Sequence, residues 1–260
     1  MTSNTGNTDL TTLSLTALFE LYAEEYARLR ELFPYQDHWR QIVAELGLET
    51  HDRILDACCG DGALTWALTK LGVPPPLVLG LDNSTAMLEH AAAEPYPSGR
   101  AMYLLSDLNA PPDEWAPAEF SAKAPSLNIT KIALINGLYA LRDPQQALAG
   151  LAQVVRPNTS LVLSTALPNP DMQAVLREHL EQVAAKGGDP AAEYNRLLGP
   201  EGVFKLIAAI NQEIIRRGAT SLHFLDEPTL RQMLDAAGWQ VMRSQIVYAG
   251  QNVLITAKKR

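Results

Sequence analysis

Cysteine is scarce in this chain of 260 residues: it occurs only at Cys58 and Cys59, which are adjacent. A disulfide needs well-separated Cα atoms and converging Cβ vectors, so neighbouring cysteines rarely form one without strain. A zinc site needs ligands at spacings that this chain does not offer. We therefore expect two reduced thiols, no disulfide and no bound metal.

Long apolar runs are also missing. No uninterrupted stretch approaches the roughly 20 residues that span a bilayer. The polar start of the chain lacks the basic and apolar regions of a secretion signal, and residues 1–10 are predicted to be a flexible tail. We therefore expect a cytoplasmic protein without a membrane-inserted segment.

Clustered positive charge is the third absence. The formal net charge is −8, and Lys and Arg are scattered apart from the terminal "KKR". Proteins that bind nucleic acid through its phosphates usually present a basic face. We therefore expect a small-molecule partner, uncharged or cationic, rather than DNA or RNA.

Short apolar runs that alternate with helical segments are present instead, at residues 53–57, 77–81, 101–106, 131–136 and 160–165. This alternation is typical of a parallel sheet covered by helices on both faces. Two further runs, 240–248 and 252–259, flank "AGQ" and predict a hairpin. The expected fold is α/β and doubly wound, with a mostly parallel seven-stranded sheet and an antiparallel last strand.

Helical periodicity places further segments around this sheet. Helices are predicted at 11–32 and 36–46, the second ending near Gly47, and at 62–71, 84–93 and 144–155.

Residues 168–219 are purely helical in pattern, starting at Asn169 and Pro170, and form an insertion between strands. Its apolar face covers either the substrate or a homodimer interface. The proline-rich stretch 109–128 is predicted to be a loop around one helical turn. We expect one domain over residues 11–260.

The stretch "RILDACCGDGALTWA" (53–67) joins the first strand to a helix through a tight turn that contains Gly60 and Gly62. Such a turn presents backbone N–H groups to a nucleotide-like ligand at the carboxyl ends of the strands. As a dinucleotide fingerprint it is poor, because Thr65 stands where a third glycine belongs and Asp56 adds negative charge. Asp56 suits instead a cationic ligand with an amino acid end.

Two further acids follow the next strands. Asp82 can accept hydrogen bonds from both hydroxyls of a ribose, and Asp107 can accept one from an adenine amino group. Leu108 offers a backbone N–H and an apolar face beside Asp107.

With these acids, the motif "DACCGDG" resembles that of the class I S-adenosylmethionine-dependent methyltransferases, with Cys58 in place of the first glycine. The resemblance covers roughly residues 15–260 and continues through "INGLYAL" and "VVRPNTSLVLS". It implies S-adenosyl-L-methionine as cofactor and S-adenosyl-L-homocysteine as product. It also implies that residues 11–47 form lid helices and 168–219 a substrate cap. The cofactor-binding residues implied are Asp56, Ala57, Cys58, Gly60, Gly62, Asp82, Asn83, Met87, Asp107, Leu108 and Asn136.

The two cysteines are interpreted as small apolar residues at a crowded turn. A thiolate in methyl transfer would need exposure and a lowered pKa, and nothing nearby in the sequence provides either.

Candidate acceptor-site residues are tyrosines and histidines. Tyr22 and Tyr26 lie one turn apart on the first helix, and Tyr139 follows the fourth strand at the position that faces the transferred methyl group in relatives. His38 can reach the acceptor if the N-terminal helices form a lid, and His179 lies on the insertion. We predict Tyr139, His38 and Tyr22 as catalytic residues, and Tyr22, Tyr26, Tyr139 and His179 as substrate-binding residues. The alternative for each is a structural role.

These observations predict methyl transfer to oxygen or carbon of a small, apolar or aromatic metabolite. Methyl transfer is an in-line displacement that relies on alignment and exclusion of water, and it needs a general base only when the acceptor keeps its proton. Two alternatives stay open: non-methylating chemistry with the same cofactor, such as cyclisation or decarboxylation, and a cofactor-binding module without catalysis.

Overall fold

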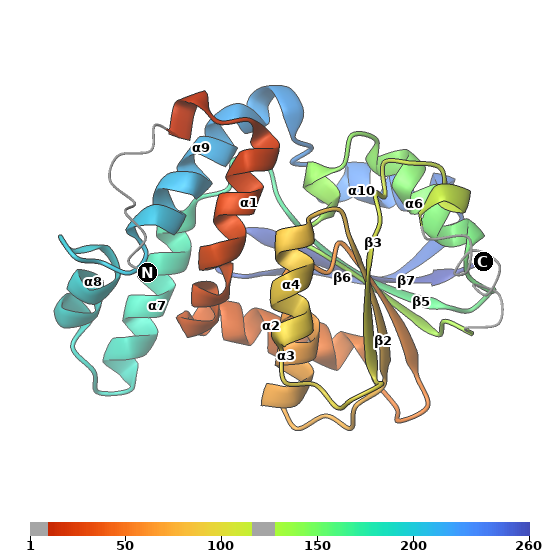
Figure 1. Cartoon of the computed structure of the whole chain (residues 1–260), viewed down its shortest axis with the longest axis horizontal. Helices are drawn as coiled ribbons and strands as arrows, with labels where there is room; N and C mark the ends of the chain where they lie inside the picture. The colour runs from red at the N-terminus through yellow and green to blue at the C-terminus, as the bar shows by residue number, and fades with distance from the viewer. Residues whose placement is uncertain (1–9, 116–127) are drawn as a thin grey trace.

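A seven-stranded sheet forms the centre of the computed structural model, which describes residues 10–115 and 128–260 (Figure 1). The strand order is β3-β2-β1-β4-β5-β7-β6, and β7 runs antiparallel to both of its neighbours. The other pairings are parallel, as the sequence predicts. The strands are β1 (Arg53–Ala57), β2 (Leu77–Asp82), β3 (Ala101–Leu105), β4 (Lys131–Ile135), β5 (Ser160–Ala166), β6 (Trp239–Val247) and β7 (Asn252–Lys259).

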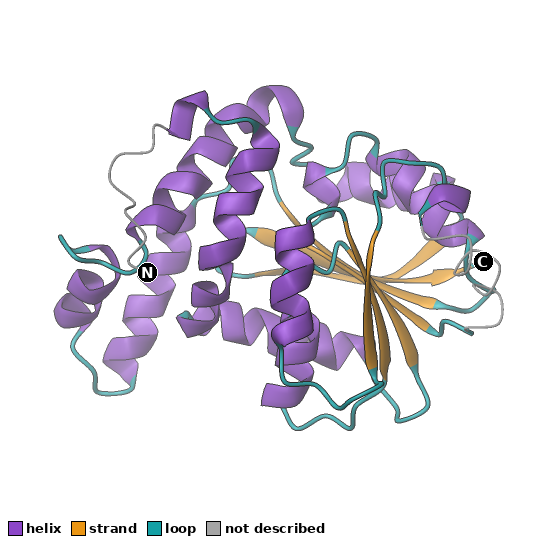
Figure 2. Cartoon of the chain, viewed as in Figure 1, coloured by secondary structure: helices purple, strands orange, loops and turns teal. Residues whose placement is uncertain are grey.

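Helices cover both faces of the sheet (Figure 2). One face packs against α6 and α10, and the other against α2 and α3, with α1 and α7 to α9 beyond the carboxyl ends of the strands. The helices are α1 (Leu15–Tyr26), α2 (Phe33–Leu46), α3 (Ala63–Lys70), α4 (Thr85–Ala93), α6 (Pro144–Gln153), α7 (Met172–Ala185), α8 (Pro190–Leu198), α9 (Lys205–Ser221) and α10 (Glu227–Ala236). Short 3-10 turns are η1 (Leu10–Thr12), η2 (Ala27–Glu31), η3 (Pro112–Glu114) and η5 (Leu138–Ala140).

The helix ends show why several boundaries are legible in the sequence. Gly47 ends α2 in the left-handed conformation, which glycine adopts without steric cost. The Ser84 side chain accepts a hydrogen bond from the Met87 N–H at the start of α4, and Asp143 does the same for Gln146 before Pro144.

Several predicted helix boundaries are wrong, including two starts: α1 begins at Leu15 rather than at residue 11, and α2 at Phe33 rather than at residue 36. The first helix ends at Tyr26, and residues 27–31 tighten into η2 rather than continuing the α-helix to residue 32. The helix predicted from Asn169 starts after Asp171, because Asn169 takes a positive φ of 57° and the Asp171 side chain caps Gln173.

The inserted helices pack on the N-terminal ones: α9 lies against α1, and α7 against α2. The apolar face of α9 is buried inside the protein, so it leaves no surface for a second copy. That face consists of Ile207, Ile210 and Ile214, and Phe204 extends it just before the helix begins.

Two predicted segments fall largely outside the described residues. They are the tail, described only at its last position in η1, and the proline-rich loop, of which residues 116–127 are not described. None of the described helices has the length and apolar character that crossing a membrane requires.

Candidate active site

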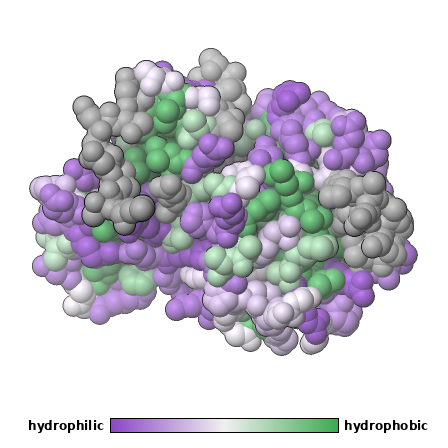
Figure 3. Space-filling model, in the orientation of Figure 1, coloured by the Kyte–Doolittle hydropathy of each residue, from purple (hydrophilic) through white to green (hydrophobic). Residues whose placement is uncertain are grey.

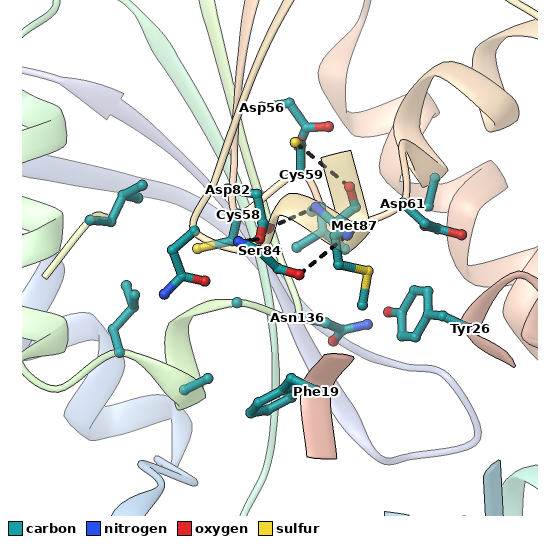
Figure 4. Close-up of a pocket in the computed structure, with 18 of the residues that line it drawn as sticks. Phe19, Tyr26, Asp56, Cys58, Cys59, Asp61, Asp82, Ser84, Met87 and Asn136 are labelled. Carbon is teal, nitrogen blue, oxygen red and sulfur yellow. Dashed lines mark hydrogen bonds between the residues drawn. The ribbon is translucent and has the colours of Figure 1, made fainter. Parts of the chain in front are cut away.

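A cavity of about 300 Å³ opens where the carboxyl ends of β1, β2 and β4 meet α1 (Figure 4). Its lining includes most of the residues predicted from the sequence to bind cofactor or acceptor. The structure brings together Asp56, Cys58, Gly60, Asp82, Asn83, Met87, Asp107, Leu108 and Asn136 with Tyr22, Tyr26 and Tyr139. Ala57 and Gly62 belong to the same loop but do not line the cavity.

The glycine loop contains three residues with left-handed backbone, Cys58 and two glycines. Gly60 has φ 53° and Gly62 has φ 77°, and α3 begins directly after Gly62. A Cβ atom at Gly62 would lie 3.0 Å from the Cα atom of Ala91, so this glycine also lets α4 approach closely. Gly62 therefore shapes the loop from behind, while Gly60 faces the cavity.

Asp82 is tied to the glycine loop by hydrogen bonds. Its Oδ2 accepts from the Gly60 N–H at 2.9 Å, and its Oδ1 accepts from the Ser84 N–H at 2.9 Å. Burial raises the pKa of this carboxyl, and the backbone donors partly oppose that shift. The bonds fix the carboxylate at the end of β2 and leave lone pairs for a ligand hydroxyl.

Asp56 is the most strongly perturbed acid in the cavity. It is 3% exposed, and burial together with the neighbouring carboxylates of Asp82 and Asp61 raises its pKa well above the usual value. A cationic ligand group would relieve this repulsion, so the inner end of the cavity favours positive charge.

Asp107 lies at the outer rim. It is exposed, and its Oδ1 accepts from the backbone N–H of Asn109 at 2.9 Å and from the Asn109 side chain at 2.8 Å. Leu108 beside it is buried and supplies the apolar face that the sequence predicts.

The two cysteines are packing residues. A Cβ atom at Gly137 would lie 2.4 Å from the Cβ of Cys58, and one at Gly80 would lie 2.8 Å from the Sγ of Cys59. Burial is the main cause that raises the pKa of both thiols. Each cysteine therefore fills space against a glycine and stays protonated.

The three tyrosines form an aromatic wall on the far side of the cavity from Asp56. Tyr22 and Tyr26 come from α1, with ring centroids 5.0 Å apart, and Tyr139 comes from η5. Burial raises the pKa of Tyr22 and Tyr26 well above 10, and that of Tyr139 to about 12. Their hydroxyls are therefore neutral near pH 7 and act as donors rather than as phenolate bases.

The structure places His38 and His179 outside the cavity. His38 is fully buried, its Nε2 lies 3.1 Å from the Ser164 Oγ, and burial lowers its pKa to about 3. His179 accepts a hydrogen bond from the Phe33 N–H at its Nδ1 (3.1 Å), and its Nε2 lies 3.0 Å from a Glu193 oxygen. Neither imidazole is positioned to touch a ligand in this cavity.

Sequence reasoning missed several lining residues, because their role depends on partners far along the chain. Asp61, between the two loop glycines, is buried and bound by Arg30 of η2 at 2.7 Å. A charged residue in a loop of otherwise small residues indicates that Asp61 has a specific role. Its partner Arg30, however, lies 31 residues earlier in the chain and cannot be identified from the sequence. Others are Phe19, Glu20, Trp39, Ser84 and Ser106.

Comparison with known proteins bears on this geometry. The model of a family described as "Methyltransferase domain" matches residues 26–244. The demethylmenaquinone methyltransferase of Lactiplantibacillus plantarum is 28% identical over 243 residues, 88% of each chain. The ubiquinone biosynthesis O-methyltransferase of Saccharophagus degradans is 27% identical over 68% of each chain.

A solved structure shares the fold. The N-methyltransferase NodS from Bradyrhizobium japonicum, in complex with S-adenosyl-L-homocysteine, has a TM-score of 0.56 and 12% identity, over 93% of this chain and 98% of that one. Family match, fold and cavity agree: the chain belongs to the methyltransferase domain family and is an S-adenosylmethionine-dependent methyltransferase.

Proposed function

We propose that this enzyme transfers a methyl group to oxygen or carbon of a small, uncharged aromatic or apolar metabolite. The observation that carries the proposal is the composition of the cavity: the buried acids Asp56, Asp61 and Asp82 gather at its inner end, whereas the opposite side is aromatic, formed by Phe19, Tyr22, Tyr26 and Tyr139. The aromatic side suits a planar apolar acceptor.

The acidic end fits the cofactor. We assign the Asp56 carboxylate to the amino group of the methionine part, Asp82 to the ribose hydroxyls, and Leu108 with Asp107 to the adenine. When bound, S-adenosylmethionine supplies a methyl group on a positively charged sulfur, and its transfer needs no protonation of the leaving group.

The protein's own contribution is to bind, align and exclude water. No histidine lines the cavity in the described part of the chain, and the tyrosine hydroxyls are neutral. The aspartates of the cavity are assigned to the cofactor or bound by Arg30, and Glu20 is exposed to solvent, so we expect the acceptor's own acidity to supply the nucleophile. Phenols, hydroquinones and enols meet this condition far better than alcohols. The α1 region then acts as a lid and α7 to α9 as a cap over the acceptor.

The relatives support the same class of acceptor. Both are named for quinone compounds, and one of them is named an O-methyltransferase. Neither name fixes the acceptor of this enzyme.

Calorimetric titration with S-adenosylmethionine and S-adenosylhomocysteine tests the cofactor assignment. We expect micromolar binding of both, and loss of at least tenfold in affinity for Asp82→Ala, because two backbone donors lose their acceptor along with the ribose contact. Asp113→Ala is the matched control, since Asp113 is exposed on η3 and lies outside the cavity.

A screen of uncharged phenols and enols for release of S-adenosylhomocysteine then tests the acceptor class. Absence of binding by either ligand would refute the cofactor assignment. Turnover confined to amines or carboxylates would refute the acceptor class.

A further inference from the structure

A second cavity lies behind the tyrosine wall. It has a volume of about 80 Å³ and shares Tyr22, Tyr26, Asn136 and Tyr139 with the cofactor cavity. We call it the acceptor chamber. Because the same four side chains bound both cavities, an acceptor in the chamber would have its reacting atom at their common boundary.

A third cavity, of about 60 Å³, continues from the chamber into the inserted helices. It shares Leu29, Met172 and Asn211 with the chamber. Its remaining lining from α7, α8 and α9 is almost wholly apolar and includes Leu197, Phe204 and Ala208. We call it the apolar end pocket. The three cavities form a row from Asp56 to α8.

The chamber is uncharged and aromatic. Among the described residues, neither the chamber nor the end pocket is lined by Asp, Glu, Lys, Arg or His. Rings approach from several elements: Tyr139 stacks on Phe224 with centroids 5.6 Å apart, and Tyr35 meets Tyr248 at 6.2 Å. These ring faces favour a planar, uncharged head group.

Four amide side chains line the chamber, and two of them, Asn136 and Asn211, have an oxygen that accepts a hydrogen bond from another side chain. The Asn136 Oδ1 accepts from the Asn252 Nδ2 at 2.6 Å, and the Asn211 Oδ1 accepts from the Tyr22 hydroxyl at 3.0 Å. Both amides therefore have their NH2 groups left as donors, and Figure 4 shows the Asn136 amide pointing toward Tyr26. Donors in a chamber without charged side chains favour a ligand that carries oxygen acceptors.

A buried chain of neutral groups holds Asn136 in this orientation. The second N–H of Asn252 donates to the Ser164 Oγ at 3.1 Å, and the same Oγ is hydrogen-bonded to the His38 Nε2, also at 3.1 Å. His38 thus acts through Ser164 and Asn252 and is a positioning residue.

From these observations we infer that the acceptor is an uncharged planar molecule whose oxygen atoms accept hydrogen bonds from Asn136 and Asn211, and whose apolar arm occupies the end pocket. The inference rests on the proposed function and specifies its acceptor.

Binding of para-alkylphenols to the complex with S-adenosylhomocysteine tests the inference, with alkylbenzenes of equal chain length as probes without oxygen. We expect affinity to rise about threefold to fourfold per methylene until the end pocket is filled. We also expect each phenol to bind about tenfold more tightly than the matching alkylbenzene. Phenols that carry a carboxylate or an ammonium group at the chain end should not bind.

Two variants separate the head from the arm. Asn211→Leu removes one donor and should abolish most of the preference for phenol over alkylbenzene, with the chain-length dependence kept. Ala208→Phe fills the end pocket and should abolish the chain-length dependence, with the phenol preference kept. The controls are Asn195→Leu and Ala192→Phe, at exposed positions of α8 that line neither cavity.

Several outcomes would overturn the inference: no binding by any probe, affinity independent of chain length, or an unchanged phenol preference in Asn211→Leu. The proposed function fails by a different measure. If the probes bind in the expected pattern and S-adenosylmethionine also binds, but no tested phenol or enol releases S-adenosylhomocysteine, recognition stands and methyl transfer to this class does not.

Discussion

Cys58 has a positive φ of 58° and Cys59 is buried; both border the cofactor cavity, and each packs closely against a glycine. We predict that neither thiol takes part in methyl transfer. Cys58→Gly removes the side chain from a left-handed backbone, and Cys59→Ala removes one buried sulfur. Both variants should keep the methyl-transfer rate within about threefold, with a stability loss on the order of 1 kcal/mol for Cys59→Ala.

The measurements are S-adenosylhomocysteine release and thermal unfolding of each variant. A fall in rate of a hundredfold or more, with cofactor affinity intact, would contradict a packing role and place a thiol in the chemistry.

The buried imidazole of His38 makes stability depend on pH. Burial lowers its pKa to about 3 in the folded protein, against an ordinary value near 6.5. Between these values the unfolded chain binds a proton that the folded chain does not, so the free energy of unfolding falls as pH falls. From pH 6 to pH 4 we expect wild type to lose about 2 to 3 kcal/mol more than His38→Gln.

Comparison with His38→Gln is necessary because Asp56, Asp61 and Asp82 have raised pKa values and act in the opposite direction. Urea unfolding of both proteins at several pH values measures the difference. Parallel pH profiles would show that His38 is protonated in the folded state.

Among single residues, those that end a strand are the ones that the sequence places most directly in the site. Asp56 and Asp82 stand at the ends of legible apolar runs, so parallel-sheet geometry brings them together. His38 lies on a predicted helix, but the imidazole is buried against Tyr248 and Ser164, which are more than 120 residues away in the chain. No local sequence pattern predicts that packing.

At the scale of elements, one largely buried guanidinium, 11% exposed, joins the N-terminal region to the glycine loop. Arg30 of η2 donates to the Asp61 carboxylate at 2.7 Å and to Glu94 at the end of α4, and it lies over the ring of Trp66. Arg30→Met would leave Asp61 buried without a counter-charge. We expect a loss of about 3 kcal/mol in the free energy of unfolding, and weaker cofactor binding because Asp61 lies beside Gly60.

Arg28→Met is the matched control two residues away, since Arg28 pairs with Glu25 on the surface and is 42% exposed. We expect Arg28→Met to lower the free energy of unfolding by less than about 0.5 kcal/mol. Chemical unfolding and calorimetry measure both effects, and equal losses in the two variants would show that the buried contact with Asp61 has no special role.

Element types could be predicted well because periodicity and capping residues are local. The break between α1 and η2 could not be predicted, because "EYARLREL" continues the helical pattern. We attribute the tighter turn to the tertiary contacts of Arg30, which no local pattern shows. Likewise the apolar face of α9 is visible in the sequence, but its partner, α1, is not.

At the scale of the whole molecule, few large apolar side chains are exposed among the described residues. The exposed large apolar side chains include Met102 and Leu105 on β3, where Figure 3 shows apolar residues gathered, and Met242 and Ile246 on β6. These lie on the two edge strands of the sheet, and a homodimer stays a prediction.

The apolar core on one face of the sheet joins the parts that the sequence separates into lid, sheet and cap. It includes Tyr22 of α1, Ile54 of β1, Val175 of α7 and Ile210 of α9, all nearly or fully buried. Elements that share one core lose it together when any of them unfolds. We therefore predict that residues 11–260 unfold as one domain.

Scanning calorimetry tests this prediction with S-adenosylhomocysteine as ligand. A ligand that binds only the folded state, present at a hundred times its Kd, stabilises that state by about 2.7 kcal/mol. In a single cooperative domain this stabilisation raises the temperature of the whole unfolding transition. We expect one peak, displaced as one by the ligand, with equal calorimetric and van't Hoff enthalpies. Two peaks, of which the ligand moves only one, would show that α7 to α9 form a separately folding unit whose contacts with α1 and α2 are weaker than their burial indicates.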